Sequence, residues 1–459
     1  MITHQAENSA AFGEAVRELR LRLKGALVLP GDPVYDTARK VWNSLVGRWP
    51  ALIVSCMGVE DIALAVQFAR RHDLPVSVRG GGHSVSGASM AEGGVAIDLS
   101  GMKGIQVDPD ALTARVEAGV LWGEFYAEAG KYGLATTGGQ LSSVGVAGLT
   151  LGGGVGWLMR KHGLTCDNLI AAEVVTAEGD LLTASDAENA DLFWGLRGGG
   201  GNFGIVSAFH FRLHPVYMVL GGAVLHPVAR AGEALRFYRD FVQTAPDELT
   251  TLAAFLTLPG LGPVLALAAC YAGDLQEGEA VVRPLREFGP PIADQLAPMP
   301  YVVLQTIFDE GAAPGFLHHI RSEFLHPLTD EAIDTVVALA SRTTSPLSQV
   351  HLIQLGGAVS RVAPGATAFR HREAPHLMAI LSAWSDSGES ERHIAWTEES
   401  WKAMLPFSSG GAYVNFMGSE GPERVKAAYG DNYDRLVALK NKYDPGNFFR
   451  LNQNIRPSE

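Results

Sequence analysis

The sequence predicts an α+β fold with two lobes. Its 459 residues exceed what one hydrophobic core ordinarily holds, so two cores are expected. Short β-like runs alternate with helical stretches as far as Pro215, and the glycine density drops after that residue. We therefore expect a glycine-rich first lobe and a middle lobe of different architecture.

The first lobe contains runs that are short, apolar and bounded by turn residues, as strands are. These runs are Ala51–Ser55, Pro75–Gly80, Val95–Ser100, Ala114–Gly119 and Glu173–Asp180, the last ending in a turn-forming Glu-Gly-Asp. Two stretches place apolar residues at helical spacing, namely Asp61–His72 and Leu121–Tyr132. Strands and helices thus interleave in this lobe.

The middle lobe, Val216–Leu405, holds three apolar runs of strand length, which we expect to form an antiparallel sheet. They are Thr251–Leu258, Pro263–Tyr271 and Val350–Val362. Beyond this lobe, Tyr429–Ile455 is predicted to be an amphipathic helix that ends at Asp444-Pro445-Gly446-Asn447 and is followed by a short irregular tail.

The composition excludes several classes of function. Thirty-six basic and 49 acidic residues give a net charge of −13, which repels nucleic acid and anionic lipid. Three widely spaced cysteines indicate neither a disulfide framework nor a zinc site, and no apolar segment is typical of a signal peptide or a membrane span. We expect a cytoplasmic protein with a small-molecule substrate; the sequence does not indicate an oligomeric state.

The 53 glycines crowd between Gly80 and Gly204, which indicates backbone pressed close to a ligand or held at positive φ. The segment Gly199–Gly204 satisfies G-x-G-x-x-G, but a helical pattern precedes it and a strand pattern follows. In a dinucleotide-binding turn a strand comes before the motif and a helix after it, and an acidic residue follows about 20 residues further along the chain. Here the next acidic residue after Gly204 is Glu233. NAD binding of this kind is disfavoured, and no P-loop motif occurs.

The segment Arg79-Gly80-Gly81-Gly82-His83-Ser84 follows a predicted strand directly. Consecutive glycines expose successive backbone N–H groups, which can form a nest for a pyrophosphate. The alternative is an ordinary glycine-rich turn with a surface histidine. Further stretches where only backbone can approach a partner favour the nest; they are Gly138-Gly139, Val144–Gly148 and Leu151–Gly156.

Four motifs in order resemble the FAD-linked oxidases of the berberine bridge enzyme-like group, in the vanillyl-alcohol oxidase superfamily. They are PVSVRGGGHSVSG, VGVAGLTLGGGVGWLMRKHGLTCDNL, DLFWGLRGGGGNFGIV and YDPGNFFRLNQNI, and the match covers Ala51–Pro215 and the last fifty or so residues. The resemblance implies a PCMH-type FAD-binding domain of two α/β subdomains, formed by residues 1–215 and completed by 406–459. Residues 216–405 would then be a substrate-binding domain whose antiparallel sheet is covered by helices.

The resemblance implies that His83 is bonded to the 8α-methyl carbon of the flavin. It places the cofactor against Arg79, Gly80, Gly81, Gly82, His83, Ser84, Gly138, Gly139, Val144, Gly145, Gly148, Gly153, Gly154, Asn168, Gly204, Val206, Asn415 and Asn452. Many relatives add a second bond from a cysteine at the position of Leu141, so this bond should be absent. Cys166 is interpreted as a packed thiol. One histidyl bond without a cysteinyl bond is the pattern of the 6-hydroxynicotine oxidases.

Alcohol-oxidising relatives carry a base in a Tyr-x-Asn-Tyr motif, which here reads Tyr413-Val414-Asn415-Phe416. Because Phe416 cannot accept a proton, either another residue is the base or the substrate needs none, as a neutral amine does. Candidate bases are Tyr301, His351 and Gln354, and strand alternation puts the last two on opposite faces. Either role of Tyr413, catalysis or packing, stays open.

The leading hypothesis is therefore a flavin oxidase that takes hydride from a small amine, alcohol or phenolic natural product. Val144 matches a position where relatives with a small side chain react with oxygen, which favours an oxidase that releases hydrogen peroxide over a dehydrogenase. The alternatives are a carbohydrate or alcohol oxidase with a base other than tyrosine, and a redox-inactive flavin-binding protein.

Overall fold

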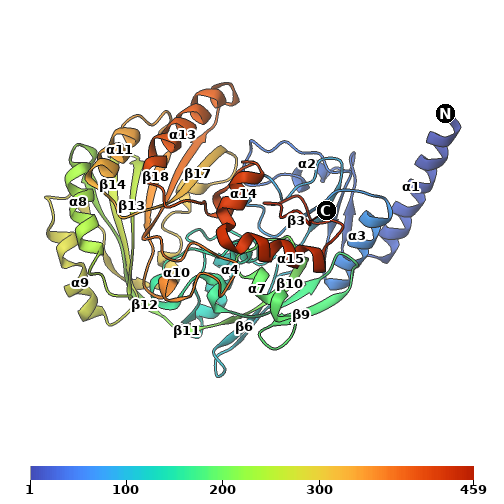
Figure 1. Cartoon of the computed structure of the whole chain (residues 1–459), viewed down its shortest axis with the longest axis horizontal. Coiled ribbons are helices and arrows are strands. Elements are labelled where there is room, and N and C mark those ends of the chain that lie inside the picture. The colour runs from blue at the N-terminus through green and yellow to red at the C-terminus, as the bar shows by residue number, and fades with distance from the viewer. Residues whose placement is uncertain (1, 459) are drawn as a thin grey trace.

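The computed structural model describes residues 2–458, and for residues 2–10 it describes the backbone alone. Helix α1 (Ile2–Arg22) lies at one end of the molecule, and the eight-stranded sheet described below lies at the other (Figure 1). The C-terminal helices α14 (Pro422–Tyr429) and α15 (Tyr433–Tyr443) lie between the two ends (Figure 1).

The sheet nearest to α1 has four short strands in the order β1-β2-β4-β3. Strands β2, β4 and β3 run parallel, and helix α3 (Val59–Arg71) connects β2 to β3. The strands are β1 (Ala26–Val28), β2 (Leu52–Ser55), β3 (Val76–Arg79) and β4 (Val95–Asp98). The glycine loop 80–84 therefore begins where β3 ends at its carboxyl edge, which is the edge where open parallel sheets hold ligands.

A second sheet has five antiparallel strands in the order β5-β6-β10-β8-β9. They are β5 (Ile105–Asp108), β6 (Thr113–Glu117), β8 (Leu169–Val175), β9 (Leu181–Ser185) and β10 (Ile205–Arg212). Helices α4 (Trp122–Gly130), α5 (Val146–Leu151), α6 (Met159–His162) and α7 (Ala190–Leu196) connect these strands. A small ladder of β7 (Leu134–Ala135) and β11 (His214–Pro215) accompanies them.

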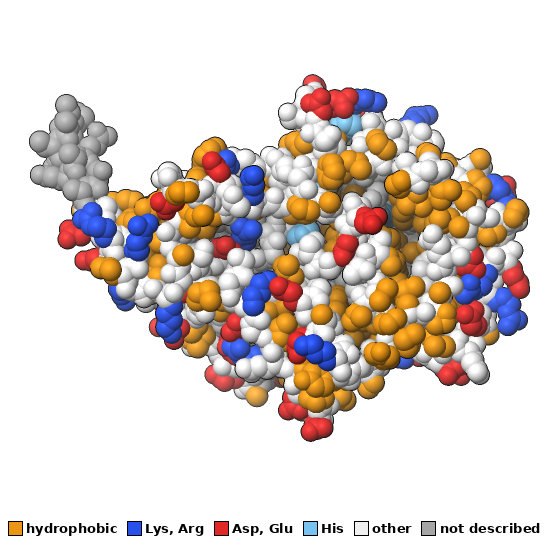
Figure 2. Space-filling view, turned by 180° about the vertical axis from the view of Figure 1, so that it is seen from behind, with side chains coloured by type: hydrophobic (Ala, Val, Ile, Leu, Met, Phe, Trp, Pro, Cys, Tyr) orange, Lys and Arg blue, Asp and Glu red, His pale blue; other side chains and the backbone are white. Residues whose placement is uncertain are grey.

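The middle of the chain forms one antiparallel eight-stranded sheet, in the order β15-β12-β14-β13-β18-β19-β17, with β16 beside β12. The strands are β12 (Met218–Pro227), β13 (Leu249–Leu258), β14 (Gly262–Tyr271), β15 (Ala293–Asp294), β16 (Ala297–Pro300), β17 (Leu317–Leu325), β18 (Gln349–Gln354) and β19 (His376–Trp384). Seen from behind, hydrophobic side chains gather over this half of the molecule (Figure 2).

Four helices cover one face of this sheet and share a hydrophobic core with it (Figure 1). They are α8 (Ala231–Val242), α9 (Leu275–Glu287), α11 (Asp330–Ala340) and α13 (Ser390–Met404). Along β18, Val350 and Leu352 face these helices, whereas Ile353 packs into the core of the first part of the chain. The alternation expected of a strand therefore gives this sheet one helix-covered face and one face toward the glycine loops.

The predicted α+β class and the antiparallel sheet of the middle part are confirmed. The predicted strands and helices of the first part are present, most with their ends moved by a few residues. The expected strand Glu173–Asp180 is displaced, because β8 spans Leu169–Val175 and a turn follows it. The expected strand Val350–Val362 is wrong in its second half. Strand β18 ends at Gln354, Gly356 and Gly357 adopt positive φ, and the short helix α12 (Ala358–Arg361) follows.

The predicted end of the C-terminal helix before Asp444-Pro445-Gly446-Asn447 and the irregular tail after it are confirmed, because α15 ends at Tyr443. The start of the helix differs, since α15 begins at Tyr433 and not at Tyr429. Gly430 adopts a φ of +51° between α14 and α15, and the chain beyond Tyr443 is irregular. This irregular tail is held by a buried ion pair, in which Lys440 Nζ lies 2.6 Å from Asp444 Oδ2 and also donates to the carbonyl of Asn202. The tail is thus fixed against the Gly199–Gly204 loop by polar contacts rather than by helical structure.

Within residues 2–458, no helix combines the length and apolar character needed to cross a membrane. Over the same residues, no group of three or more histidine, cysteine, aspartate or glutamate side chains is arranged to hold a metal ion.

Candidate active site

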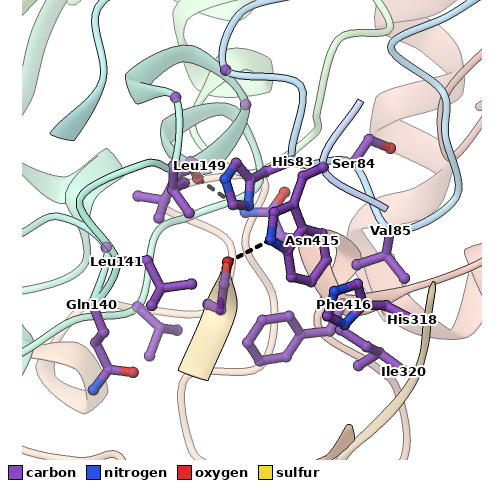
Figure 3. Close-up of a pocket in the computed structure, with 18 of the residues that line it drawn as sticks. His83, Ser84, Val85, Gln140, Leu141, Leu149, His318, Ile320, Asn415 and Phe416 are labelled. Carbon is purple, nitrogen blue, oxygen red and sulfur yellow. Dashed lines mark hydrogen bonds between the residues drawn. The ribbon is translucent and has the colours of Figure 1, made fainter. Parts of the chain in front are cut away.

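A cavity of about 940 Å³ lies between the glycine loops and the face of the eight-stranded sheet that the helices do not cover. The glycine loops 80–84, 139–148 and 200–204 form one side, and β12, β17, β18 and β19 contribute side chains to the other. Residues 413–417 and 449–453 of the C-terminal part complete the wall. Segments far apart in the sequence thus meet around one space (Figure 3).

Two of the glycine loops touch each other backbone to backbone. A Cβ atom on Gly81 would lie 2.4 Å from the backbone N of Gly145, and one on Gly145 would lie 2.3 Å from the N of Gly81. Neither backbone can move aside as a flexible side chain would, so both positions require glycine. The loops therefore present main chain rather than side chains to the cavity.

The first loop also has free backbone donors. Among the described residues, none accepts a hydrogen bond from the N–H groups of Gly81, Gly82, His83 or Ser84. Successive N–H groups without intramolecular partners can together bind an anion. The cradle fits the pyrophosphate of FAD in this respect.

The charged side chains around the cavity are few. Of the residues that line it, Glu310 is the only aspartate, glutamate, lysine or arginine. Arg79, which the sequence analysis placed with the cofactor, does not line the cavity; its Nη1 donates to the carbonyl of Ala38, and its Nε lies 3.9 Å from Asp98. Backbone dipoles, not guanidinium or ammonium groups, would therefore balance a pyrophosphate here.

His83 closes the first glycine loop and lines the cavity (Figure 3). Burial lowers the pKa of its imidazole to about 4, against a smaller opposing effect of Asp309. Its ring nitrogens make no hydrogen bond to any described residue. At neutral pH the ring is uncharged, and a nitrogen lone pair is available to a ligand.

Neither Leu141 nor Cys166 offers the cavity a reactive nucleophile, unlike His83. Leu141 lines the cavity near His83 (Figure 3) and offers no nucleophile. Cys166 is fully buried, is not among the cavity-lining residues, and has a pKa raised by burial, with a smaller contribution from Asp167. A thiol in this environment is unreactive.

Tyr413 is 3% exposed, and its hydroxyl is engaged by two donors. The backbone N–H of Gly154 donates to it at 3.1 Å, and the side-chain amide of Asn415 donates at 2.9 Å. Burial raises the pKa of Tyr413 to about 12, so the phenol stays protonated at neutral pH. Its contacts position Asn415 and Gly154, and they support the packing interpretation of Tyr413.

Phe416 lies beside His318 and Ile320 in the cavity wall (Figure 3) and packs edge-on against Tyr413, with ring centroids 5.1 Å apart. Asn415 and Asn452 also line the cavity. The amide nitrogen of Asn452 donates to the carbonyl of Gly201, while its Oδ1 is buried with no donor among the described residues. This acceptor without a partner is a second feature that fits a cofactor with N–H or hydroxyl groups.

The sheet side brings His351 into the cavity, next to Gln349, with 2.7 Å between His351 Nε2 and Gln349 Oε1. Burial lowers the pKa of His351 to about 4. Gln354 lies on the opposite face, where it bonds Thr251 and the carbonyl of Val242. Tyr301 is buried against Tyr126 and does not line the cavity. Of the three candidate bases, the structure brings only His351 to the site.

Several expected cofactor residues lie outside the cavity lining, and each has a packing reason. A Cβ on Gly138 would meet the Trp122 ring at 2.3 Å, one on Gly153 would meet Phe369 at 2.6 Å, and one on Gly154 would meet Thr165 at 2.1 Å. The Asn168 side chain bonds the carbonyls of His162 and Leu164 and the ring of His214. These residues shape the loops instead of lining the cavity. The other expected cofactor residues, except Arg79, line the cavity; they are Gly80, Gly81, Gly82, His83, Ser84, Gly139, Val144, Gly145, Gly148, Gly204, Val206, Asn415 and Asn452.

Sequence reasoning missed the polar residues that the middle part contributes. Thr257, Gln295, Gln349 and His318 line the cavity from four different segments. The alternation within β18 could have paired Gln349 with His351, but nothing in the sequence relates the other segments to one another. Trp42, from the loop that follows helix α2 (Tyr35–Ala38), was missed for the same reason.

Two families match the chain. The family described as FAD binding domain matches residues 50–185, and the family described as berberine and berberine like matches residues 412–456. An uncharacterised FAD-linked oxidoreductase of Bacillus subtilis is 34% identical over 445 residues, which cover 95% of this chain and 98% of that protein. (R)-6-hydroxynicotine oxidase of Paenarthrobacter nicotinovorans is 31% identical over 455 residues, covering 95% of this chain and 98% of that protein.

Solved structures give the same result. The crystal structure of 6-hydroxy-D-nicotine oxidase from Arthrobacter nicotinovorans superposes with a TM-score of 0.88 at 29% identity, over 95% of this chain and 99% of that one. The BBE-like 1 protein of Physcomitrella patens superposes with a TM-score of 0.89 at 25% identity, over 97% and 99% of the two chains. The relatives agree in sequence and in fold along nearly their whole length.

Proposed function

Because the chain belongs to the berberine bridge enzyme-like family of FAD-linked oxidoreductases, we propose that it is an oxidase acting on a small organic amine. The bound flavin would take up hydride from the substrate and pass the electrons to O2, which leaves as hydrogen peroxide. Residues 1–215 with 406–459 would hold the FAD, and residues 216–405 would supply the substrate side. The three free, buried cysteines, Cys56, Cys166 and Cys270, suit a reducing, cytoplasmic environment.

The observation that carries the proposal is the neutral, unpartnered imidazole of His83 at the end of a cradle of free backbone N–H groups. The cradle would hold the pyrophosphate, and the ring would then bond the 8α-methyl carbon of the flavin. This bond replaces one hydrogen on the ring nitrogen and one on the methyl carbon, and O2 takes up the two hydrogens as hydrogen peroxide. Leu141 and the buried Cys166 leave no second nucleophile, so we propose a single covalent bond.

An amine is favoured by the side chains that face the cavity. Phe416 cannot accept a proton, and the Tyr413 phenol is held protonated by burial. A neutral amine needs no base, since its nitrogen lone pair expels hydride. Glu310 is the only charged residue of the lining, so an ammonium substrate meets no cationic side chain as it enters.

One observation favours a second candidate, an alcohol or carbohydrate oxidase that uses His351 as its base. The imidazole faces the cavity, its pKa is lowered to about 4 by burial, and Gln349 fixes its orientation. A neutral imidazole can accept the hydroxyl proton as hydride leaves. The two candidates therefore differ in whether His351 takes part in the reaction.

The decisive experiment for the cofactor is acid precipitation of the purified protein, followed by mass spectrometry of the flavin-carrying peptide. Flavin should stay with the wild type and with Cys166→Ser, and it should be lost from His83→Ala. Flavin attached to Cys166, or released completely from the wild type, would contradict the single histidyl bond.

The substrate class is tested by mixing the holoenzyme with panels of amines, alcohols and oligosaccharides under nitrogen, then admitting oxygen and measuring peroxide. Bleaching of the flavin by amines with His351→Gln still active supports the amine proposal. Bleaching by alcohols or sugars that depends on His351 supports the second candidate. A flavin that no compound bleaches would instead indicate a redox-inactive binding protein.

A further inference from the structure

A stack of three rings lies beside the loop that carries His83. The indole of Trp42 is nearly parallel to the imidazole of His83, with centroids 5.0 Å apart and an interplanar angle of 21°. The indole also stacks with the ring of His318, with centroids 3.8 Å apart and an interplanar angle of 16°. His83 and His318 come from different parts of the chain, and both lie at the cavity (Figure 3).

Hydrogen bonds fix Trp42 at both ends. Its backbone N–H donates to the carbonyl of Gly82 at 3.1 Å, directly before His83. Its indole Nε1 donates to the carbonyl of Ala312, another residue of the cavity lining, at 2.8 Å. The ring therefore cannot swing away from His83 without breaking its hydrogen bond to Ala312.

The residues after Trp42 extend the same attachment. Asn43 is 2% exposed; its Oδ1 accepts from the N–H of His318, and its Nδ2 donates to the carbonyls of His318 and Val85. Arg48 donates to the carbonyls of Ser86, Gly87 and Met90. Residues 42–48 are thus hydrogen-bonded both to residues 85–90, which follow His83, and to the start of β17.

We propose that Trp42 is a positioning residue for His83, which holds the imidazole plane so that a ring nitrogen points at the 8α-methyl carbon of the flavin. The inference rests on the proposed covalent bond and adds the element that orients its nucleophile. His83 makes no hydrogen bond of its own to a described residue, so its orientation depends on packing contacts, and the stacked indole of Trp42 is one of them. Holding a nucleophile in the reactive geometry raises the rate of bond formation without changing ligand affinity.

His318 completes the stack from the sheet side. It is 5% exposed, and its Nε2 is buried without a partner among the described residues. Its close stacking on the indole restricts the tilt of the Trp42 ring. The orientation of the nucleophile is thus set jointly by the N-terminal segment and by β17.

The test follows covalent attachment over time. Full-length apoprotein is produced under riboflavin limitation, FAD is added, and acid-stable flavin is measured in Trp42→Ala, Trp42→Leu, Trp42→Phe and wild type. The matched control is Trp49→Phe, because Trp49 is 52% exposed and stacks on Arg39 outside the cavity. Non-covalent affinity for FAD is measured separately by adding each Trp42 change to His83→Ala.

Attachment should slow by about 10-fold to 100-fold in Trp42→Ala and Trp42→Leu, because a misplaced nucleophile reacts at rates reduced to this degree. Trp42→Phe, which restores a stacking face, should recover most of the rate, and Trp49→Phe should match the wild type. When a Trp42 change is added to His83→Ala, the affinity for FAD should stay within about threefold of the affinity of His83→Ala alone, because the pyrophosphate cradle is unchanged.

Wild-type attachment rates in Trp42→Leu would overturn the inference while leaving the covalent bond in place. A loss of FAD affinity in the His83→Ala background as large as the loss of attachment rate would also overturn the inference, because Trp42 would then merely support the loop. If Trp42→Ala does not fold, Trp42→Leu and Trp42→Phe still decide the question. Release of all flavin from acid-treated wild type would instead refute the proposed bond itself.

Discussion

The two walls of the cavity differ in the chemical groups that they present, which are backbone on one side and side chains on the other. The glycine loops present backbone N–H groups, and at Gly81 and Gly145 they exclude even a Cβ atom. The sheet side presents side chains from separate strands, among them His318, Gln349 and His351. Backbone recognition suits the invariant pyrophosphate of a cofactor, whereas side chains on a rigid sheet can be exchanged to suit a substrate.

The largest expected effect comes from breaking the backbone-built wall. Gly145→Ala should yield protein without bound flavin and with lowered stability, because the new Cβ would lie 2.3 Å from the N of Gly81. Overpacking of this kind costs about 1–3 kcal/mol or more. Gly365→Ala is the control, since a Cβ there meets nothing within 4 Å. Normal flavin content in Gly145→Ala would show that the loops can separate freely.

The eight-stranded sheet behind the cavity wall should respond to acid through a buried imidazole, that of His376 at the start of β19. Burial, aided by Arg160, lowers the pKa of His376 to about 4, and this side chain is 5% exposed. As pH falls from 6.5 to 4, the unfolded chain takes up a proton that the folded chain does not, so the free energy of unfolding decreases.

His376→Leu should reduce the stability lost between pH 7 and pH 4.5 by about 2 to 3 kcal/mol, the value of a pKa difference of this size. Denaturant unfolding at the two pH values measures it. The same change at the exposed His326 is the control. An identical loss in wild type and His376→Leu would place the acid sensitivity elsewhere.

The contact between the two walls and the C-terminal part is tested at Tyr413. Tyr413→Phe removes the acceptor for the N–H of Gly154 and one of two acceptors for the amide of Asn415, which keeps the carbonyl of Leu149. The buried Gly154 N–H left unpaired costs about 1–3 kcal/mol. We expect a lower melting temperature and weaker flavin retention in the His83→Ala background. Tyr433→Phe is the control, because its hydroxyl makes no hydrogen bond to a described residue. If Tyr413→Phe and the wild type have equal melting temperatures, the hydroxyl of Tyr413 has a role other than packing.

The smallest effect is expected from a hydroxyl added at the sheet-facing wall. Phe416→Tyr should leave amine turnover flat or lower, because the new phenol must be solvated or paired in a wall built without it. The pH profile of flavin reduction should follow the pKa of the amine substrate. If Phe416→Tyr turns over simple alcohols much faster than the wild type does, and the wild type is inactive on every amine, the protein is an alcohol oxidase that lacks its base.

The sequence by itself determined the backbone-built wall. Loops such as Arg79–Ser84 and Val144–Gly148 can be recognised from their own residues, because clustered glycines indicate close backbone approach or positive φ. The contact between Gly81 and Gly145 then supplies the partner for that close approach. The order of helix, Gly199–Gly204 and strand was also readable, and α7 and β10 confirm it. The alternation in β18 correctly separated His351 from Gln354 for the same local reason.

Only the tertiary structure decided the rest. The packing roles of Gly138, Gly153 and Gly154 depend on Trp122, Phe369 and Thr165, which no local pattern connects to them. The direction of Arg79 depends on Asp98 and Ala38, and the stack on His83 depends on Trp42 and His318, which are 276 residues apart (318 − 42). Side chains find their partners across the fold, and a chain of this length permits too many pairings for sequence alone to choose among them.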